Sequence, residues 1–366
     1  MANRPLDDRI KSLYDAGIVP YSISKLNAID GCLKEAFYTY KLGIRDKGKQ
    51  NIYGVMGSEI HDVLEKIYNN QATGDDLLPA LQRELADAEM IGVDFPKDFK
   101  GGTSIRDNWV AAMQDFCNNF EKLEGEFRTE ELTILKISDS RYLIGYIDLI
   151  QIIDEEKKII NIYDFKTSSQ FKKDDLLHHG RQLVVYAMAM EQAGYTIQNL
   201  AWIMLKYVTV TYMGYARANA KNKTKISKVI LRGKLGKELS KAVERQLIEE
   251  GYGEVDIEIM VDTFRQKNSF DCLPDSVAQN FKIQQCIEYY EYNDELKEEA
   301  LEYINSRADR FEELYQKDED AWTPVEITQK ESFYCNSLCL YRELCPEIKK
   351  YNDLFELKNM DDEDLF

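Results

Sequence analysis

Two acidic residues and one lysine near the middle of the chain have the types and spacing that metal-assisted hydrolysis needs. Asp148 ends the segment Gly145-Tyr-Ile-Asp148, and Asp164 and Lys166 belong to a later segment, Asp-Phe-Lys-Thr. Side chains two residues apart on a strand share one face, so Asp164 and Lys166 would point the same way. A hard divalent cation needs acidic oxygens, and an adjacent lysine can orient or deprotonate a water molecule or neutralise a phosphate. This combination suits phosphodiester hydrolysis, although an Asp-x-Lys triplet by itself is common by chance.

A histidine upstream and a glutamine and tyrosine downstream could complete such a site. His61 lies on an expected helix, and imidazole is a common ligand for transition metals but a less usual one for magnesium. The alternative is a half-buried helix histidine that binds no metal. Gln182 and Tyr186 are four residues apart, which places them on one face of a helix. Both can hydrogen-bond a phosphate or contact a base, and the alternative is a surface amide beside a core tyrosine.

Hydrophobic periodicity predicts the elements that would position these residues. Apolar residues recur at helical spacing over 22–40, 57–68 and 104–123, so the N-terminal third is expected to be mostly helical. Segments rich in Ile, Leu and Tyr then predict strands, with a hairpin loop at 154–157. The expected strands are 132–137, 141–153 and 158–165, followed by a helix over 174–193 and a strand over 200–210. This order gives an α/β fold with a mixed central sheet flanked by helices, and a helical region is expected again over 276–315.

Seven cysteines, an odd number, favour free thiols or metal ligands over a disulfide framework. Three of them form a C-terminal group, Cys335-x3-Cys339-x5-Cys345, which has no fourth ligand nearby for a tetrahedral metal or a cubane cluster. Cys32 could supply that fourth thiolate. The alternatives to an iron–sulfur cluster are structural zinc and free thiols. The remaining cysteines lie in apolar or helical settings and are expected to be buried thiols: Cys117, Cys272 and Cys286.

The chain is acidic overall and basic in one stretch. Its 366 residues include 47 Lys and Arg against 65 Asp and Glu, a net charge of −18, which argues against binding nucleic acid or anionic membrane by bulk attraction. Residues 206–245 instead hold eleven Lys or Arg and two Glu, interleaved with tyrosines. Phosphate attraction and base stacking hold a strand without reading its sequence, so this stretch is a candidate DNA contact. The candidate DNA-binding residues are Arg217, Lys221, Lys223 and Lys225, and the alternative is a solvated surface.

The hydropathy of the chain and its terminal segments allow predictions about the location of the protein and about its partners. The longest apolar runs are far shorter than the about 18 residues needed to cross a bilayer, and the N-terminus lacks the order of a secretory signal. We therefore expect a cytoplasmic protein without membrane contact, with its cysteines in a reducing compartment. Residues 351–366 form an acidic tail that ends in Leu365 and Phe366. Such a tail could dock on a helicase, a single-stranded-DNA-binding protein or a clamp, and the alternative is a solubilising tail.

The order of these motifs resembles the RecB-like branch of the PD-(D/E)XK nuclease superfamily. In that branch Gly-x-x-x-His-x-x-Leu-Glu precedes Gly-x-x-Asp, Asp-x-Lys and Gln-x-x-x-Tyr, and all four motifs occur in this order between Gly57 and Tyr186. One cysteine before the first motif and three after the last are similar to the iron–sulfur type, which includes AddAB nuclease domains and CRISPR-associated adaptation nucleases. Two details depart from that type: three residues separate Cys335 from Cys339 where the family usually has two, and Leu33 replaces a frequent proline.

The resemblance implies a restriction-endonuclease-like core with helical extensions and a role for each motif residue. The implied ligands of one or two Mg²⁺ or Mn²⁺ ions are His61, Asp148, Asp164 and the backbone carbonyl of Phe165. Lys166 would position and activate the attacking water, and Gln182 and Tyr186 would shape the DNA side of the site. A [4Fe–4S] cluster would fasten the chain ends around the core, and its implied ligands are Cys32, Cys335, Cys339 and Cys345.

The expected function is that of a metal-dependent DNA nuclease, acting as an exonuclease on single-stranded DNA or DNA ends in repair, recombination or phage DNA metabolism. The alternatives are a structure-selective endonuclease and a non-catalytic DNA-binding assembly subunit. The sequence has no Gly-x-x-x-x-Gly-Lys-Ser/Thr phosphate loop, so no helicase activity is expected within it. The expected organisation is a helical region 1–130, a nuclease core 131–210, a basic insertion and helical region 211–320, an iron–sulfur segment 321–350 and the acidic tail 351–366.

Overall fold

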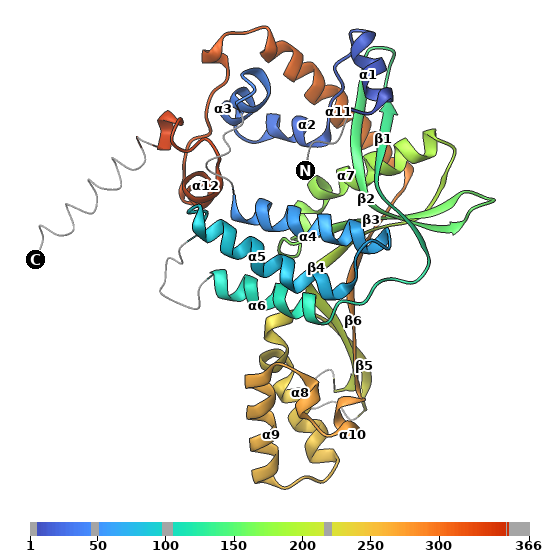
Figure 1. Ribbon diagram of the computed structural model, residues 1–366, viewed down its shortest axis with the longest axis vertical. Coiled ribbons are helices and arrows are strands. Elements are labelled where there is room, and N and C mark those ends of the chain that lie inside the picture. Colours follow the sequence, from blue (N-terminus) through green and yellow to red (C-terminus); the bar gives the residue numbers. More distant parts are fainter. Residues whose placement is uncertain (1–5, 45–50, 97–104, 216–221, 349, 351–366) are drawn as a thin grey trace, which may run out of the picture.

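A six-stranded sheet forms the centre of the computed structural model, which describes residues 6–44, 51–96, 105–215, 222–348 and 350 (Figure 1). Its strand order is β1-β2-β3-β4-β5, and β6 pairs separately with β4. The β3–β4 pair is parallel and the other pairs are antiparallel. The strands are β1 Glu126–Lys136, β2 Tyr142–Asp154, β3 Ile159–Lys166, β4 Thr196–Gly214, β5 Thr224–Leu231 and β6 Phe281–Tyr290. The expected α/β fold, with a mixed sheet flanked by helices, is confirmed.

Strands β2 and β3 form the expected hairpin, and its register sets the relative position of the two motif carboxylates. Leu149 pairs with Tyr163, and Asp148 and Asp164 are the next residues along the two strands. β3 is buried along almost its whole length, which is typical of a strand that is covered on both faces. The hairpin therefore presents both carboxylates at one end of the central strand pair.

Three helices cover one face of the sheet. They are α4 Ile52–Tyr68, α5 Leu77–Met90 and α6 Ile105–Asn118, which lie together in Figure 1. Leu64 of α4 packs in one buried cluster with Leu149 of β2 and Phe165 of β3. α4 begins earlier than the apolar pattern predicts, because the side chain of Asn51 caps it by accepting a backbone N–H two residues on. This packing fixes the helix of the motif histidine against the hairpin of the motif carboxylates.

The opposite face of the sheet is covered by α7 (Leu176–Gln192), which is the crossover between the parallel strands β3 and β4. Leu183 of α7 belongs to a buried cluster with Trp202 of β4. Gly145 of β2 allows close approach, since a Cβ at this position would lie 2.5 Å from Cε1 of Tyr186. Side chains on the inner face of α7 can therefore reach the hairpin.

Five helices lie near the two ends of the described chain, and helices from opposite ends share a buried cluster. They are α1 Asp8–Asp15, α2 Ile23–Asp30, α3 Leu33–Ala36, α11 Asp294–Tyr315 and α12 Gln329–Phe333. Leu26 of α2 shares a buried cluster with Phe311 of α11 and with Trp322. The single helix expected over 22–40 is wrong, because the backbone leaves the helical region at Gly31 and Cys32. The apolar spacing continues across that break and gives no sign of it.

The helical region expected over 276–315 is also wrong in its first part, because that part is mostly strand β6. β6 pairs with β4 over most of its length, and the long helix α11 begins only at Asp294. Apolar residues occupy positions 281, 283, 287 and 289, which is the two-residue period of a strand. This segment therefore forms a strand, and the strand pairs with β4, which is far away in the sequence.

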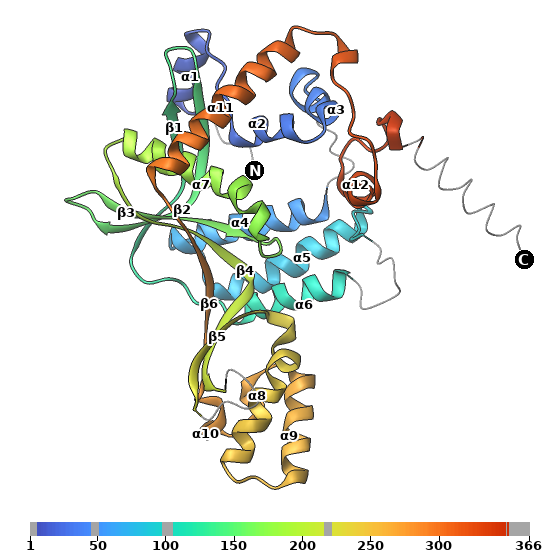
Figure 2. The ribbon, with the colours of Figure 1, turned by 180° about the vertical axis from the view of Figure 1, so that it is seen from behind.

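Strands β4, β5 and β6 extend beyond the covered part of the sheet and carry a helical module (Figures 1 and 2). The module contains α8 Leu235–Glu249, α9 Glu254–Lys267 and α10 Asp275–Ala278. Leu239 of α8 and Phe264 of α9 belong to a buried cluster of its own. β4 runs through the position of the expected boundary between core and insertion, so the module grows out of the sheet. In the described ranges, no helix is both long and apolar enough to cross a membrane.

Candidate active site

A cleft between α4, the β2–β3 hairpin and α7 contains the six core residues that the motifs single out. It has a volume of about 800 Å³. The motif residues in its lining are His61, Asp148, Asp164, Lys166, Gln182 and Tyr186. α4 supplies the histidine, β2 and β3 supply the carboxylates and the lysine, and α7 supplies the amide and the phenol. The fold thus assembles motifs that are separate in the sequence.

Asp148 is held by the neighbouring strand and lies close to the motif histidine. Its Oδ2 accepts a hydrogen bond of 2.8 Å from the backbone N–H of Phe165 and lies 3.4 Å from Nδ1 of His61. The ring of His61 meets the ring of Phe165 edge-on, with 5.9 Å between the centroids. Burial opposes protonation of His61, but its hydrogen bond to Asp148 and the charges of both aspartates outweigh burial and raise the pKa of the imidazole. His61 and Asp148 therefore form an ion pair when the imidazole is protonated.

Lys166 links Asp164 to the amide and the phenol of α7. Its Nζ lies 2.6 Å from Oδ2 of Asp164 and donates a hydrogen bond of 3.3 Å to Oε1 of Gln182. Nε2 of Gln182 in turn donates to the hydroxyl of Tyr186 at 2.8 Å. Burial acts against the charge of Lys166, but Asp164 outweighs burial, so the pKa of the lysine is raised. Burial raises the pKa of Asp164, and the ammonium acts against that rise. The position of the ammonium is thus fixed from two sides.

The donor chemistry of the cleft fits a hard divalent cation, but the side chains do not stand in ligand geometry. Two carboxylates, an imidazole and a backbone carbonyl are donors that Mg²⁺ or Mn²⁺ accepts. Oδ2 of Asp164 is buried and accepts no regular hydrogen bond, although the ammonium of Lys166 is near. Among the residues that the structure describes, no three His, Cys, Asp or Glu side chains are grouped so that they could hold a metal ion. A cation would therefore require the two carboxylates to turn toward a common point.

The four cysteines of the expected cluster lie in segments from both ends of the chain. Cys32 directly precedes α3, and Cys335, Cys339 and Cys345 lie in the segment that follows α12. Burial raises the pKa of Cys335 to about 11, and Cys32 and Cys345 add to the rise. Burial also raises the pKa of Cys339 to about 12, and Cys32 and Cys335 add to that rise. All seven cysteines are free thiols. In the described part of the chain, no three of the four thiols form a group that could hold a metal ion, so the structure shows no cysteine cluster.

Aromatic and hydrogen-bonding contacts also join the two segments that carry these cysteines. The rings of Tyr38 and Tyr341 lie 5.2 Å apart between centroids. The hydroxyl of Tyr341 donates to the backbone carbonyl of Ile44 at 2.8 Å, and the hydroxyl of Tyr334 donates to Oε1 of Glu35 at 2.9 Å. The N-terminal helices and the cysteine segment therefore pack together through ordinary contacts as well.

The predicted DNA contacts of the basic stretch lie on the helical module or outside the described residues. Arg217 and Lys221 lie outside the described residues, as does the acidic tail 351–366. Lys225 lies on β5, and Lys223, just before that strand, forms an ion pair with Glu249 of α8. These two lysines are not in the lining of the cleft that holds the motif residues.

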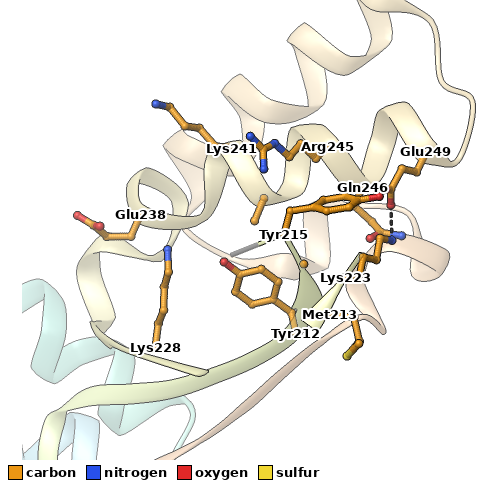
Figure 3. Close-up of a pocket in the computed structure, with 12 residues that line it drawn as sticks. Tyr212, Met213, Tyr215, Lys223, Lys228, Glu238, Lys241, Arg245, Gln246 and Glu249 are labelled. Atoms are coloured by element: carbon orange, nitrogen blue, oxygen red, sulfur yellow. Dashed lines mark hydrogen bonds and ion pairs between the residues drawn. The ribbon is translucent and has the colours of Figure 1, made fainter. Parts of the chain in front are cut away.

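A pocket of about 280 Å³ opens next to Lys223, between the end of β4 and α8 (Figure 3). Tyr212 and Tyr215 line it from the strand side, and Lys241 and Arg245 line it from α8. Two glutamates share the lining, so the basic charge is partly neutralised within the pocket. Aromatic and basic side chains are thus neighbours on the module, as the interleaved sequence predicts.

The cleft contains two acidic residues that the sequence motifs do not single out, Asp62 of α4 and Glu130 of β1. The β1–β2 register places Glu130 level with Asp148. Its φ of 49° lies in the left-handed region, which is uncommon for a residue other than glycine and concentrates at functional sites. Glu130 lies next to Glu131, just before the expected strand 132–137, so no sequence signal marks it.

A family model of the PD-(D/E)XK nuclease superfamily matches residues 20–346. The match covers most of the chain, including the hairpin, the helices on both faces of the sheet and the cysteine segment. The chain therefore belongs to the PD-(D/E)XK nuclease superfamily. Membership indicates a metal-dependent nuclease, and Mg²⁺ or Mn²⁺ is the usual cofactor of this class of hydrolases. Comparison with curated proteins gives no match.

Proposed function

We propose that the chain is a metal-dependent deoxyribonuclease that hydrolyses phosphodiester bonds in single-stranded DNA or at DNA ends. The observation that carries the proposal is the meeting of His61, Asp148, Asp164 and Lys166 in one cleft of a PD-(D/E)XK chain. This set combines acidic donors for a cation with an ammonium that can act on a phosphate or on a water molecule.

The residues of the cleft divide into metal ligands and a group that acts on water. The proposed ligands are His61, Asp148, Asp164 and the backbone carbonyl of Phe165. A bound Mg²⁺ or Mn²⁺ ion supplies positive charge to the phosphate and lowers the pKa of water. Lys166 orients the attacking water, and its Nζ is already fixed by Gln182 and the adjacent carboxylate.

The amide of Gln182 is proposed to contact the DNA strand, with Tyr186 positioning it. Tyr186 is buried, whereas Gln182 is half-buried at the wall of the cleft. Because the phenol hydroxyl accepts one amide hydrogen, it fixes the orientation of the amide. We propose additional phosphate contacts through four basic residues of the stretch 206–245, which are Arg217, Lys221, Lys223 and Lys225.

We also propose a [4Fe–4S] cluster that fastens the two ends of the chain. Its ligands would be Cys32, Cys335, Cys339 and Cys345. Support comes from the packing of the segments that carry the four thiols, since hydrogen bonds join Tyr341 to Ile44 and Tyr334 to Glu35. Protein purified without oxygen should contain about four iron atoms and matching sulfide per chain. Zinc without iron in that preparation would show a structural zinc site instead.

We propose exonuclease action, and a structure-selective endonuclease is the second candidate. A non-catalytic DNA-binding assembly subunit is the rival from another class. The free thiols favour a reducing compartment, so we propose the cytoplasm as the location. A role in repair, recombination or phage DNA metabolism stays a prediction, as does docking of the acidic tail on a helicase, a single-stranded-DNA-binding protein or a clamp.

The decisive experiment incubates the purified protein with end-labelled single-stranded and double-stranded DNA, with Mn²⁺ or with EDTA. Cleavage should require the metal and should be lost in Asp164→Asn. A circular single strand and strands with blocked 5′ or 3′ ends separate the two modes, because only an endonuclease cuts a circle. DNA binding without cleavage under every metal condition would instead favour the assembly subunit.

A further inference from the structure

A second cavity lies next to the candidate active site, and a largely buried lysine without a counter-ion in the described ranges lines it. It has a volume of about 530 Å³ and lies between α6, β4 and the residues that follow β3. Its lining includes Tyr53, Trp109, Thr167, Ser168, Lys206 and Tyr207. None of the described residues in its lining is acidic, so the cavity offers no counter-ion of its own to a cationic side chain.

Lys206 reaches this cavity where β4 is irregular. The β4–β6 register shifts between Ile203 and Val208, which indicates a bulge in β4 at this point. Lys206 is only 8% exposed, and in the described ranges no ion pair or hydrogen bond joins its ammonium to another residue. Burial lowers its pKa to about 8, without any charged neighbour. A buried ammonium is unfavourable unless an acceptor, best of all an anion, takes up its hydrogen bonds.

Trp109 of α6 lines the cavity from a different element. The residue is 4% exposed and belongs to a buried apolar cluster. Its Nε1 is fully buried, as are those of Trp202 and Trp322, so the indole N–H does not face the cavity. Trp109 therefore contributes its aromatic ring to the wall of the space that Lys206 reaches.

The other walls and the location of the cavity indicate the class of ligand. Four aromatic side chains, including Tyr207, can contact a planar group, and the hydroxyls of Thr167 and Ser168 can bond phosphate oxygens. Tyr53 lines both this cavity and the catalytic cleft, and Thr167 directly follows Lys166 in the chain. A strand that passes Lys166 would therefore continue into the cavity.

We propose that this cavity binds one nucleotide of the DNA strand next to the scissile phosphate. Lys206 donates hydrogen bonds to the phosphate of that nucleotide, and the aromatic side chains, Trp109 among them, contact its base. Identification of the strand as DNA rests on the proposed function, whereas the binding of a nucleotide phosphate does not. Stacking is tolerant of base identity, so the subsite anchors the strand without selecting a sequence. Lys206 is thus a binding residue that does not touch the reacting atoms.

Calorimetric titration with thymidine 5′-monophosphate in EDTA tests the subsite in the full-length protein without any cleavage. Lys206→Met should weaken binding of this nucleotide by about tenfold or more, since a hydrogen bond to a charged group is lost. Thymidine, which lacks the phosphate, should bind the wild type and Lys206→Met equally. Lys157→Met is the matched control, because Lys157 is an exposed lysine at the β2–β3 turn. This variant should bind the nucleotide with the affinity of the wild type.

The outcomes separate the subsite from the proposed function. Equal affinity of the wild type and Lys206→Met for the nucleotide, or no binding to the wild type, overturns the subsite. Trp109→Leu removes the aromatic ring, so unchanged affinity in that variant overturns the contact of Trp109 with the base. Thermal unfolding curves check that each variant is folded. Cleavage without nucleotide binding rejects only the subsite, whereas Lys206-dependent binding in a protein that never cleaves rejects only the proposed function.

Discussion

Two buried lysines on the neighbouring strands β3 and β4 have opposite surroundings. Lys166 has Asp164 at 2.6 Å, and its pKa is raised, whereas Lys206 has no charged neighbour in the described ranges, and its pKa is lowered to about 8. Burial acts against the charge of both lysines, so the partner decides the direction of the pKa shift. Lys166 has its counter-ion within the described chain, whereas Lys206 would have one only if an anion were bound.

Removal of the paired lysine is expected to have the largest effect. Lys166→Met takes away the group proposed to orient water and leaves Asp164 buried without its counter-ion. We expect the cleavage rate at saturating Mn²⁺ to fall by about 10²- to 10⁴-fold. The exposed Lys157→Met should cleave at the wild-type rate. If Lys166→Met cleaves within a few-fold of the wild type, the proposed role of the pair is wrong.

The buried cysteines resemble Lys206, because burial shifts the pKa of their thiols and no cation among the described residues acts against that shift. We expect Cys339→Ser to lose iron and to lower the free energy of unfolding by several kcal/mol, on the order expected for a structural metal site. Iron analysis and thermal unfolding measure the two effects. Cys272→Ser is the control, since Cys272 lies on the helical module and donates to the backbone carbonyl of Ser269. Equal iron content and stability in both variants would contradict the cluster.

The unpaired lysine should destabilise the folded protein in phosphate-free buffer, so Lys206→Met should be more stable than the wild type. A pKa lowered from 10.5 to about 8 corresponds to about 3 kcal/mol at pH 7. Below about pH 8 both the folded and the unfolded wild type carry this charge, and the full cost is present. Between about pH 8 and 10.5 the folded state has lost the proton while the unfolded state keeps it, so the cost falls. Urea unfolding should show that Lys206→Met raises the free energy of unfolding more at pH 7 than at pH 10. An equal rise at both pH values would contradict the unpaired charge.

The two lysines also show what the sequence could predict of the site. Lys166 was predicted from residue types and local spacing, because Asp-x-Lys on a strand places both side chains on one face. By contrast, the sequence presents Lys206 only as one of eleven basic residues in the stretch 206–245. Its burial depends on a bulge in β4 relative to β6, and this long-range pairing leaves no mark in the local sequence.

The helices and strands can be divided in the same way, into those that the local sequence determines and those that it does not. The β2–β3 hairpin and α7 were predicted, because apolar periodicity and a polar turn determine them locally. β6 and the break at Gly31 were not predicted. The two-residue apolar period of β6 is present in the sequence but lies inside the helical region expected over 276–315, and the break at Gly31 lies within continuous helical spacing. No local pattern marks Glu130, since only the sheet register brings it level with Asp148.

A third lysine, Lys223, provides the smallest expected effect, because it is partly exposed and already paired with Glu249. Surface pairs contribute little to stability, so Lys223→Ala should leave unfolding unchanged. If Lys223 contacts a phosphate, the variant should weaken single-stranded DNA binding in EDTA by a few-fold and reduce the salt slope by about one. Glu249→Gln should act in the opposite direction, because it frees the ammonium for the strand. If neither variant changes the salt dependence, the module does not hold DNA through this lysine, and its ion pair serves only to join β5 to α8.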